Sequence, residues 1–450
     1  MITDVPPQIE YEAANSIRDF AIFNRFLRSR IEFVANTQGN FTPFASFHFL
    51  NLLLRHRSGS QLQEADTPTT VHSLASSFVF QIKGNVYPIG YYSVSLAIGN
   101  PAKFYDLDID TGSDLTWLQC DAPCTGCTIP QNRLYKPRGN VVICVDPLCA
   151  GVQSAPPCAV ANEQCDYEVH YADDGSSLGV LVRDYIPVKF TNGSLQLPIL
   201  GFGCGYHQTN PGHHPPPSIA GVLGLGNGKI SIVSQLHSLG LIRNVVGHYL
   251  SGRGGGFLFF GDQFIPQSGV DWTPMLQSSS VQQNYKTGPA DLLFDGKPTS
   301  VKDLELIFDS GSSYTYFNSI AHKVLVDLIT NDIKGKPLIR ETADSSLPIC
   351  WKGPKAFKSL HDVTGNFKTL VLSFTKAKNS LLQVPPEAYL IVTEHGNVCL
   401  GILDATEIGL GNINIIGDIS LQDKIVIYDN EKQQIGWASP NGKCDGPSKL

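Results

Sequence analysis

Two aspartates, Asp110 and Asp309, stand in nearly identical settings, and each could act as a general acid or base. Each follows a short run whose apolar residues have the spacing or density of a β-strand, and each precedes a Thr/Ser-Gly-Ser turn. The same local motif therefore occurs twice, and each copy carries one carboxyl group at the end of a strand. The residues of the two turns are Thr111, Gly112, Ser113, Ser310, Gly311 and Ser312.

The resemblance between the two stretches continues downstream. Gly221–Gly226 (GVLGLG) follows Asp110, and Ile413–Asp418 (INIIGD) follows Asp309 at a similar distance along the chain. Two copies of a strand, an acidic turn and a later apolar-apolar-glycine segment indicate two related halves. Each half contributes one aspartate.

Two such carboxyl groups would support amide hydrolysis if the fold brings them together. Carboxyl groups about 3 Å apart do not both ionise, so one of them keeps a proton. The ionised group can take a proton from water, while the protonated group donates a hydrogen bond to a peptide carbonyl. Water then attacks without a covalent intermediate. Because the pair titrates as a unit, either aspartate can carry the proton.

A calcium loop is the first alternative for this stretch. Asp106, Asp108 and Asp110 have the spacing at which such a loop begins. However, Thr111 stands at the sixth position, where the loop needs Gly, and Trp117 stands at the twelfth, where it needs Glu. The calcium interpretation is therefore rejected.

The chain has eleven cysteines, and seven of them lie between Cys120 and Cys165. This density favours disulfides in an oxidising compartment, with a zinc cluster as the alternative. Cys120, Cys124 and Cys127 also have the spacing of a radical-SAM iron–sulfur site, although Gly126 stands where that site favours an aromatic residue. The disulfide candidates are Cys120, Cys124, Cys127, Cys144, Cys149, Cys158, Cys165, Cys350, Cys399 and Cys444.

Four longer motifs resemble the pepsin-like aspartic peptidases, and within them the plant nucellin-like branch. They are DTGSDLTWLQCDAPC, CDYEVHYADDGSSLGVLV, GVLGLGNGKISIVSQL and IFDSGSSYTYF, and the resemblance covers about Val79 to Cys444. It implies a mainly β, bilobal fold of two related β-barrel lobes, with the active site in the cleft between them. Asp110 and Asp309 would be the catalytic dyad of an endopeptidase that acts on a protein or peptide and needs no cofactor or metal.

A catalytically silent protein-binding member of the same fold is the second functional hypothesis. Such relatives typically lack one catalytic aspartate, and both aspartates are present here. The resemblance also implies that Tyr171 lies on a flap over the substrate and hydrogen-bonds to Trp117. Asp174 stands where related flaps often have Gly, which leaves the conformation of the flap tip open.

The resemblance further implies a disulfide between Cys350 and Cys399 in the second lobe. Related sequences usually have Cys where this chain has Tyr249. One cysteine has therefore lost its partner, and we nominate Cys204 as the free thiol.

We expect three segments. Residues 1–78 would be an N-terminal extension. Resembling enzymes carry a basic prosegment that covers the acidic cleft, and the basic amphipathic pattern of this extension suits such a zymogen segment. A loose extension with no such role is the alternative. Residues 79–265 would form the first peptidase lobe and residues 266–450 the second. A helix is expected over residues 319–331, and its buried face is predicted to contain Ile320, Val324, Leu325 and Leu328.

Charge and short motifs bear on partners and location. The net charge of −7 provides no basic field for nucleic acid. No transmembrane segment is evident, and we expect a monomer. Asn192 and Asn40 match the glycosylation pattern. The cysteines favour a secreted or vacuolar protein, although a clean signal peptide is missing and the terminal residues 448–450 (Ser-Lys-Leu) match a peroxisomal address.

Overall fold

The computed structural model describes residues 77–152, 160, 162–209, 219–276, 284–377 and 380–439. Most of the N-terminal extension, Asn40, Cys158, Cys444 and the C-terminal tripeptide lie outside these residues. In the described part of the chain, no helix is long and apolar enough to cross a membrane.

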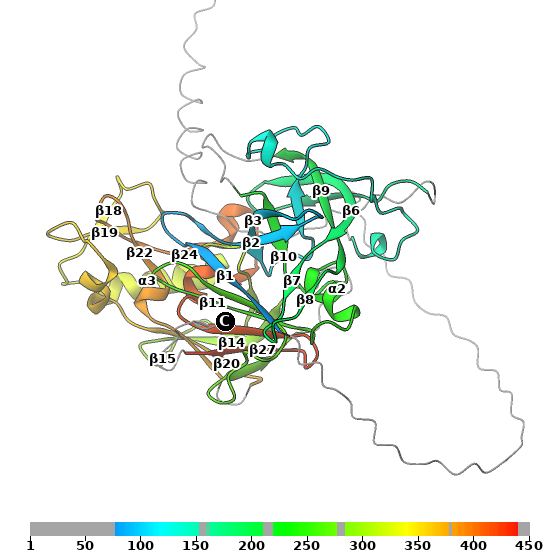
Figure 1. The fold of residues 1–450 in the computed structure, drawn as a ribbon. Helices are drawn as coiled ribbons and strands as arrows, with labels where there is room; N and C mark the ends of the chain where they lie inside the picture. Colours follow the sequence, from blue (N-terminus) through cyan, green and yellow to red (C-terminus); the bar gives the residue numbers. More distant parts are fainter. Residues whose placement is uncertain are drawn as a thin grey trace, which may run out of the picture. The chain divides into compact units, whose positions relative to one another are not determined.

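The chain is mainly β, as the sequence predicts (Figure 1). Short strands alternate with turns rich in Gly, Pro, Asn and Asp, because these residues adopt tight backbone conformations that interrupt a strand. The strands of the first half are β1 (Phe78–Asn85), β2 (Tyr91–Ile98), β3 (Lys103–Asp110), β4 (Trp117–Gln119), β5 (Asp166–His170), β6 (Ser176–Tyr185), β7 (Val188–Lys189), β8 (Leu195–Gln196), β9 (Ile199–Thr209), β10 (Gly221–Gly224), β11 (Val245–Leu250) and β12 (Gly256–Phe260).

The second half has more and shorter strands. They are β13 (Asp271–Pro274), β14 (Lys286–Phe294), β15 (Lys297–Pro298), β16 (Leu304–Phe308), β17 (Thr315–Phe317), β18 (Ile339–Glu341), β19 (Cys350–Lys352), β20 (Leu370–Phe374), β21 (Leu381–Val384), β22 (Leu390–Val392), β23 (Val398–Leu400), β24 (Ile402–Asp404), β25 (Asn414–Ile416), β26 (Ile425–Asp429) and β27 (Gln434–Ala438).

The described helices are few and short. The α-helices are α2 (Ile232–Ser238), α3 (Ser319–Asp332) and α4 (Asp418–Leu421). Single 3₁₀ turns are η1 (Gln131–Arg133), η2 (Cys149–Gly151), η3 (Leu360–Asp362), η4 (Thr364–Asn366), η5 (Pro386–Ala388) and η6 (Ala405–Ile408).

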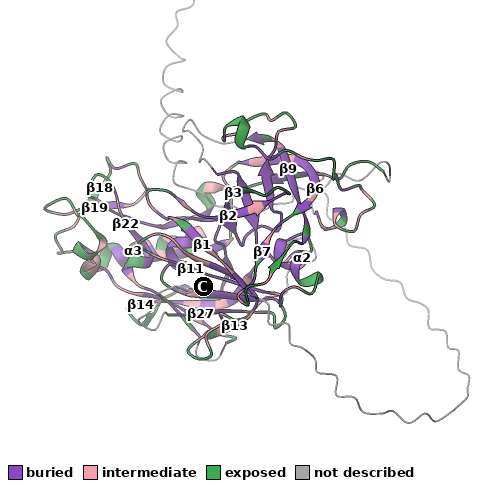
Figure 2. Cartoon of the chain, viewed as in Figure 1, coloured by how far each residue is buried: buried purple, intermediate pink, exposed green. Residues whose placement is uncertain are grey.

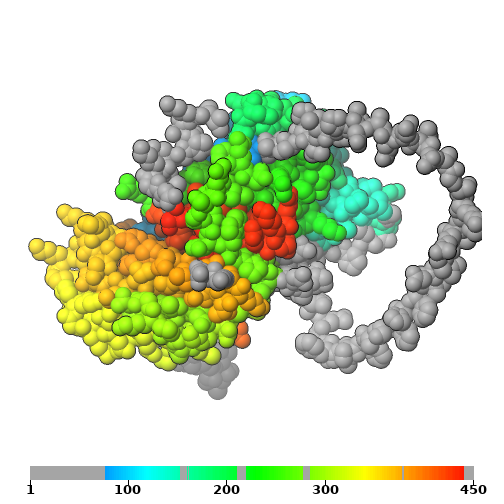
Figure 3. Space-filling model, turned by 90° about the horizontal axis from the view of Figure 1, so that it is seen from below, coloured from blue at the N-terminus to red at the C-terminus, as the bar shows by residue number. Residues whose placement is uncertain are grey.

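Two large sheets position the acidic turns. A 13-stranded sheet has the order β13-β27-β26-β11-β12-β1-β2-β3-β10-β4-β9-β6-β5, and an 8-stranded sheet contains β21-β20-β14-β16-β25-β17-β24 with β15 on β14. The strands β13, β26 and β27 come from the second half but belong to the first of these sheets. In the space-filling view, yellow and orange residues of the second half gather apart from the cyan residues of the first, while red C-terminal residues lie against green ones (Figure 3).

The two halves repeat one arrangement around their aspartates. In the first, β10 runs parallel to β3, with Gly224 opposite Asp110, and antiparallel to β4. In the second, β25 runs parallel to β16 and meets β17 antiparallel, with Tyr316 opposite Ile415. In each half, a strand from later in the sequence therefore lies between the strand before the acidic turn and the strand after it. This internal similarity agrees with the predicted repeat.

The ends of both strands that lead into the aspartates are buried, over 107–110 in β3 and 306–308 in β16. Figure 2 labels β3 and colours the chain by burial. Leu107 and Ile109 of β3 have no exposed surface, and neither has Asp110. A strand with two buried faces packs against side chains on both sides, so a turn at its end is held firmly.

The helix predicted over residues 319–331 is present as α3, but its predicted buried face is wrong in part. Ala321, Leu325 and Ile329 are buried, whereas Ile320 is 79% exposed. The buried residues recur at intervals of four, which places them on one side of the helix, and Ile320 lies outside that stripe.

Candidate active site

The first acidic turn holds the Asp110 carboxylate with groups of the turn itself. The backbone N–H of Gly112 donates to Asp110 Oδ1 at 2.8 Å, and the Ser113 hydroxyl donates to Oδ2 at 2.6 Å. Each carboxylate oxygen therefore accepts one bond from the same turn. The Gly at the centre of the turn and the Ser at its end are explained by these two bonds.

The second turn repeats the same bonds with nearly the same lengths. The backbone N–H of Gly311 donates to Asp309 Oδ1 at 2.9 Å, and the Ser312 hydroxyl donates to Oδ2 at 2.6 Å. Asp309 is fully buried, like Asp110. The predicted support residues of both turns therefore lie where the sequence pattern places them.

Reciprocal hydrogen bonds join the two turns to each other. The backbone N–H of Thr111 donates to Ser310 Oγ at 3.1 Å, and the backbone N–H of Ser310 donates to Thr111 Oγ1 at 2.9 Å. Each hydroxyl then donates across the junction to a strand carbonyl, Thr111 to Phe308 O at 3.0 Å and Ser310 to Ile109 O at 3.1 Å. We call these four bonds the clasp. Because all of them are buried, the clasp fixes one turn relative to the other.

A glycine on the crossing segment lies against each turn. A Cβ atom on Gly417 would lie 2.0 Å from Tyr314 O, and one on Gly224 would lie 2.5 Å from the Asp114 backbone. No side chain fits at such distances, so the apolar-apolar-glycine motif ends in Gly for a steric reason. The two glycines also donate backbone bonds to matching hydroxyls, at 3.1 Å to Thr116 and 3.2 Å to Thr315.

The two carboxyl groups interact directly. Burial raises the pKa of Asp309 above its ordinary range, a rise that hydrogen bonds from Ser312, Gly311 and Asp110 oppose. A hydrogen bond between two carboxyl groups requires one proton on the pair. The fold thus brings together the two aspartates that the sequence places in separate halves.

A third buried carboxyl group lies close to the pair. Asp418 begins α4, and its backbone N–H donates to Ser312 O at 2.7 Å. Burial raises the pKa of Asp418 well above its usual range, and the charges of Asp108, Asp309 and Asp110 raise it further. Burial and the neighbouring carboxylates therefore both favour the neutral form of Asp418.

The predicted flap is a β-hairpin of β5 and β6, and its tyrosine contacts the predicted tryptophan. The indole N–H of Trp117 donates to the hydroxyl of Tyr171 at 2.5 Å, and both side chains are buried. The turn closes with a 2.8 Å bond from Tyr171 N to Gly175 O. Asp174 has a φ of 63°, so it adopts the left-handed conformation that Gly would adopt, which Asp tolerates better than most residues.

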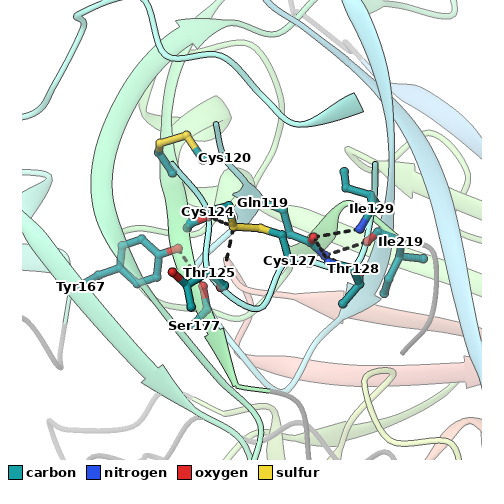
Figure 4. Close-up of a disulfide and its surroundings, with 12 residues drawn as sticks. Gln119, Cys120, Cys124, Thr125, Cys127, Thr128, Ile129, Tyr167, Ser177 and Ile219 are labelled. Atoms are coloured by element: carbon teal, nitrogen blue, oxygen red, sulfur yellow. Dashed lines mark hydrogen bonds between the residues drawn. A yellow bond between two sulfur atoms is a disulfide. The ribbon is translucent and has the colours of Figure 1, made fainter. Parts of the chain in front are cut away.

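The described cysteines exclude the iron–sulfur and zinc interpretations, because their sulfurs are used in disulfides. Cys120 pairs with Cys204, and Cys124 pairs with Cys127 (Figure 4). Cys149 pairs with Cys165 and the predicted bridge between Cys350 and Cys399 is present, while Cys144 is also disulfide-bonded.

The nomination of Cys204 as the free thiol is wrong. Cys204 on β9 lies opposite Leu118 of β4 in a parallel pair, and Cys120 follows β4 directly. The 5.2 Å separation of the Cα atoms suits a disulfide. The presence of Tyr249 where related sequences have Cys therefore does not leave Cys204 unpaired, because the Cys204 sulfur is bonded within its own sheet.

The cysteine-rich segment is held by hydrogen bonds as well as disulfides. Gln119 Oε1 accepts from the backbone N–H of Thr128 at 2.7 Å and of Ile129 at 3.3 Å (Figure 4). Its Nε2 donates to Ile219 O at 3.1 Å. These bonds tie the loop after β4 to the strand region that crosses behind Asp110.

Asn192 lies in an exposed turn between β7 and β8. Its Oδ1 accepts from the Ser194 backbone N–H at 2.9 Å and from the Ser194 hydroxyl at 2.7 Å. The side chain is accessible, and its glycosylation stays a prediction.

Sequence reasoning missed two residues beneath the clasp. His248 on β11 and Tyr428 on β26 are fully buried, and Tyr428 lies within 3.5 Å of Thr111 Oγ1. Nothing in their local sequence sets them apart from ordinary strand residues. Only the pairing of strands from the two halves brings them to the acidic turns.

Comparison with known proteins places this geometry in a family. Over 384 residues the chain is 42% identical to an aspartic proteinase of Oryza sativa subsp. japonica, covering 82% of this chain and 92% of that protein. The chain belongs to the pepsin-like aspartic proteinases. Two family models also match, described as "Xylanase inhibitor N-terminal" over residues 92–262 and "Xylanase inhibitor C-terminal" over residues 289–439.

Solved structures of this aspartic proteinase fold support the same architecture. The basic 7S globulin from soybean superposes with a TM-score of 0.62 at 16% identity, covering 82% of this chain and 98% of that chain. The aspartic proteinase from Irpex lacteus gives a TM-score of 0.56 at 17% identity, covering 82% and 99%. These likenesses confirm the bilobal β fold. Family membership makes the chain an aspartic-type peptide hydrolase.

Proposed function

We propose that this protein is an aspartic endopeptidase in which Asp110 and Asp309 share one proton and activate a water molecule. The clasp is the observation that carries the proposal. It joins two turns from different halves of the chain by four buried hydrogen bonds, and a further hydrogen bond connects the two carboxyl groups. A purely structural role would not need two buried carboxyl groups that face each other and share a single proton.

The chemistry follows from the state of the pair. The ionised carboxylate accepts a proton from water, and the resulting nucleophile attacks the peptide carbonyl carbon. The protonated carboxyl donates to the carbonyl oxygen as negative charge develops there. Collapse of the tetrahedral intermediate breaks the C–N bond, and a carboxyl proton passes to the leaving nitrogen. No covalent bond forms between enzyme and substrate.

The groups within each turn keep the carboxyl groups in place during these transfers. Gly112, Ser113, Gly311 and Ser312 each donate to one carboxylate oxygen. Because these bonds are made within each turn, protons are exchanged where the two carboxyl groups face each other. Tyr171, held by Trp117, lies on the hairpin proposed to close over the bound peptide.

Asn substitution at either aspartate tests the proposal. Asp110→Asn and Asp309→Asn each remove a proton-transfer group, so kcat on a peptide library should fall at least about a hundredfold while the fold is retained. Asp327→Asn, on the exposed side of α3, is the control and should retain wild-type kcat. Near wild-type turnover of Asp309→Asn would show that the dyad assignment is wrong.

The pH dependence has a definite sign. Activity requires one proton on the pair, and burial raises the pKa of Asp309. Activity is therefore lost as pH rises through this raised pKa, and it is also lost at low pH when the second carboxyl becomes protonated. A bell-shaped profile with an acidic optimum is expected. A chelator should leave the activity unchanged, and a statine-type transition-state mimic should inhibit it.

We further propose that the protein acts on protein or peptide substrates in the endomembrane system, as a monomer. Its several disulfides support an oxidising compartment over the peroxisome. Membership of the nucellin-like branch, removal of a prosegment and glycosylation at Asn192 belong to the same proposal.

A further inference from the structure

A row of buried polar groups runs from β11 to the clasp. His248 on β11 and Tyr428 on β26 have no exposed surface. The two strands pair antiparallel, and His248 Nε2 lies 3.1 Å from the Tyr428 hydroxyl oxygen. That oxygen lies 3.5 Å from Thr111 Oγ1. The row therefore joins a strand of the first half, a strand of the second half and the turn of Asp110.

The hydrogens along this row have one consistent direction. A backbone carbonyl only accepts, so the single hydrogen of the Thr111 hydroxyl goes to Phe308 O, at 3.0 Å. A bond between Thr111 and Tyr428 must then use the tyrosine hydrogen. The Tyr428 oxygen is left to accept, and His248 Nε2–H is the donor. The row thus runs from His248 through Tyr428 and Thr111 to the residue before Asp309.

This direction of the hydrogen bonds identifies the tautomer of His248. Nε2 carries the hydrogen, and Nδ1 is bare. Nδ1 is buried without a hydrogen-bond partner, so a second proton there would bury a charged N–H that has no acceptor. Burial accordingly lowers the pKa of His248 to about 3. The side chain stays a neutral donor across the acidic range in which the proposed peptidase works.

We propose that His248 and Tyr428 are positioning residues for the reaction: through Thr111 they hold the Phe308 carbonyl and hence the turn that carries Asp309. This inference rests on the proposed function. In this proposal both residues act through Thr111 and not directly on the carboxyl groups. The Tyr428 ring also packs on Tyr285, with centroids 4.2 Å apart, and Tyr285 donates to Leu225 O behind Asp110. The same cluster therefore contacts the backbone beside both aspartates.

Three substitutions break or keep the row. Tyr428→Phe removes the middle hydroxyl, and His248→Leu removes the donor at its start. His248→Gln keeps an N–H donor of similar reach. The first two should lower kcat at least tenfold with KM within twofold, and His248→Gln should lower kcat less than threefold. The double variant Tyr428→Phe/His248→Leu should lose no more than Tyr428→Phe alone, because one break already interrupts the row.

Tyr389→Phe is the matched control. Tyr389 is also fully buried, and its hydroxyl donates to Lys368 O at 2.7 Å with no connection to either acidic turn. It should cost comparable stability in urea and leave kcat unchanged. Equal losses of kcat in Tyr389→Phe and Tyr428→Phe, or kcat within twofold of wild type in both Tyr428→Phe and His248→Leu, would overturn the proposal. Active sites are counted with a statine-type inhibitor.

A second measurement does not depend on activity. In protein labelled with ¹⁵N-histidine, the resonances missing from His248→Gln identify His248. They should show the neutral Nε2–H form at pH 4.5, and they should shift in Tyr428→Phe. An Nδ1–H form or an imidazolium would overturn the row even if the wild-type chain failed to cleave peptides. That failure would instead refute the proposed function.

Discussion

Burial is the main physical influence on the single acids around the two turns. Asp309 and Asp418 are fully buried, and burial is the largest cause of the raised pKa of each. Asp114, one residue beyond the first turn, is a third case. Its Oδ1 accepts from Gly228 N at 2.7 Å, but burial still raises its pKa to about 6. Removing a carboxylate from water outweighs one backbone hydrogen bond here.

Asp114 should make the protein less stable as pH rises. Its pKa is about 6 in the folded chain, compared with an ordinary value of 3.8, so between these values the folded state binds more protons than the unfolded state. The stabilisation is complete below the lower value and is lost as pH rises through the window. The loss should be about 3 kcal/mol. Urea unfolding at pH 4 and pH 7 measures it.

Asp114→Asn is the comparison variant. The amide oxygen can still accept from Gly228, but the side chain does not ionise. The free energy of unfolding of wild type should therefore fall more between pH 4 and pH 7 than that of the variant. Equal pH dependence in the two proteins would mean that Asp114 is not held protonated.

For single residues, the sequence predicts those that lie in a short contiguous motif, and it misses those that only the folded chain brings together. Asp110 and Asp309 are found because each acidic turn is a short contiguous motif. His248 and Tyr428 are not, since they meet only when β11 pairs with β26. The prediction for Cys204 is wrong for a related reason: its partner is 84 residues away in the sequence, and only the parallel pairing of β4 and β9 brings the two together.

At the scale of elements, the two crossing segments must approach the turns closely. Gly417 and Gly224 leave no room for a methyl group, because backbone atoms of the turns or of the residues that follow them lie in the way. Backbone cannot move aside as the end of a flexible side chain can. The steric limit explains why both halves end their apolar-apolar motif in the same residue.

Gly417→Ala should therefore destabilise the protein by at least about 3 kcal/mol or prevent folding, because overpacking here displaces the turn of Asp309. Gly224→Ala should do the same in the first half. Gly365 is the control, since a Cβ there would meet nothing within 4 Å. Gly365→Ala should change the urea midpoint little. A wild-type midpoint for Gly417→Ala would contradict the steric account.

The helix α3 shows how far periodicity predicts an element. The pattern of apolar residues indicates a helix over 319–331, and the structure places one at Ser319–Asp332. Its rotation is predicted less well, since Ile320 faces solvent and Ala321 is buried. Hydrophobicity alone favours Ile over Ala for burial. Close packing can instead select the smaller side chain, which only the neighbouring strands reveal.

At the scale of the whole molecule, one sheet joins the two halves. Strands β26 and β27 of the second half extend the sheet of the first through β11, and β26 carries Tyr428 to the clasp. The repeat predicts two halves with one aspartate each. It does not predict this exchange of strands, because repetition within a sequence carries no information on which edges pair. The lobe boundary near residue 265 stays a prediction.

The disulfides restrain the first half of the chain most. Three described bridges lie there, and the bridge from Cys120 to Cys204 spans 84 residues. In the chain-entropy account, closing a loop of that length stabilises the fold by roughly 4 kcal/mol. Reduction should therefore weaken the sheet region that holds β4 and β9 before it affects the second half.

The final prediction concerns the odd cysteine. All nine described cysteines are disulfide-bonded, and eight of them pair with one another in four bridges. Eleven cysteines leave one sulfur over in a monomer. Thiol counting on denatured, unreduced protein should give close to one free thiol, and alkylation with peptide mapping should place it at Cys158 or Cys444. Label on Cys204 would contradict its pairing with Cys120. A count near eleven would refute the disulfide framework and make the terminal Ser-Lys-Leu the better guide to location.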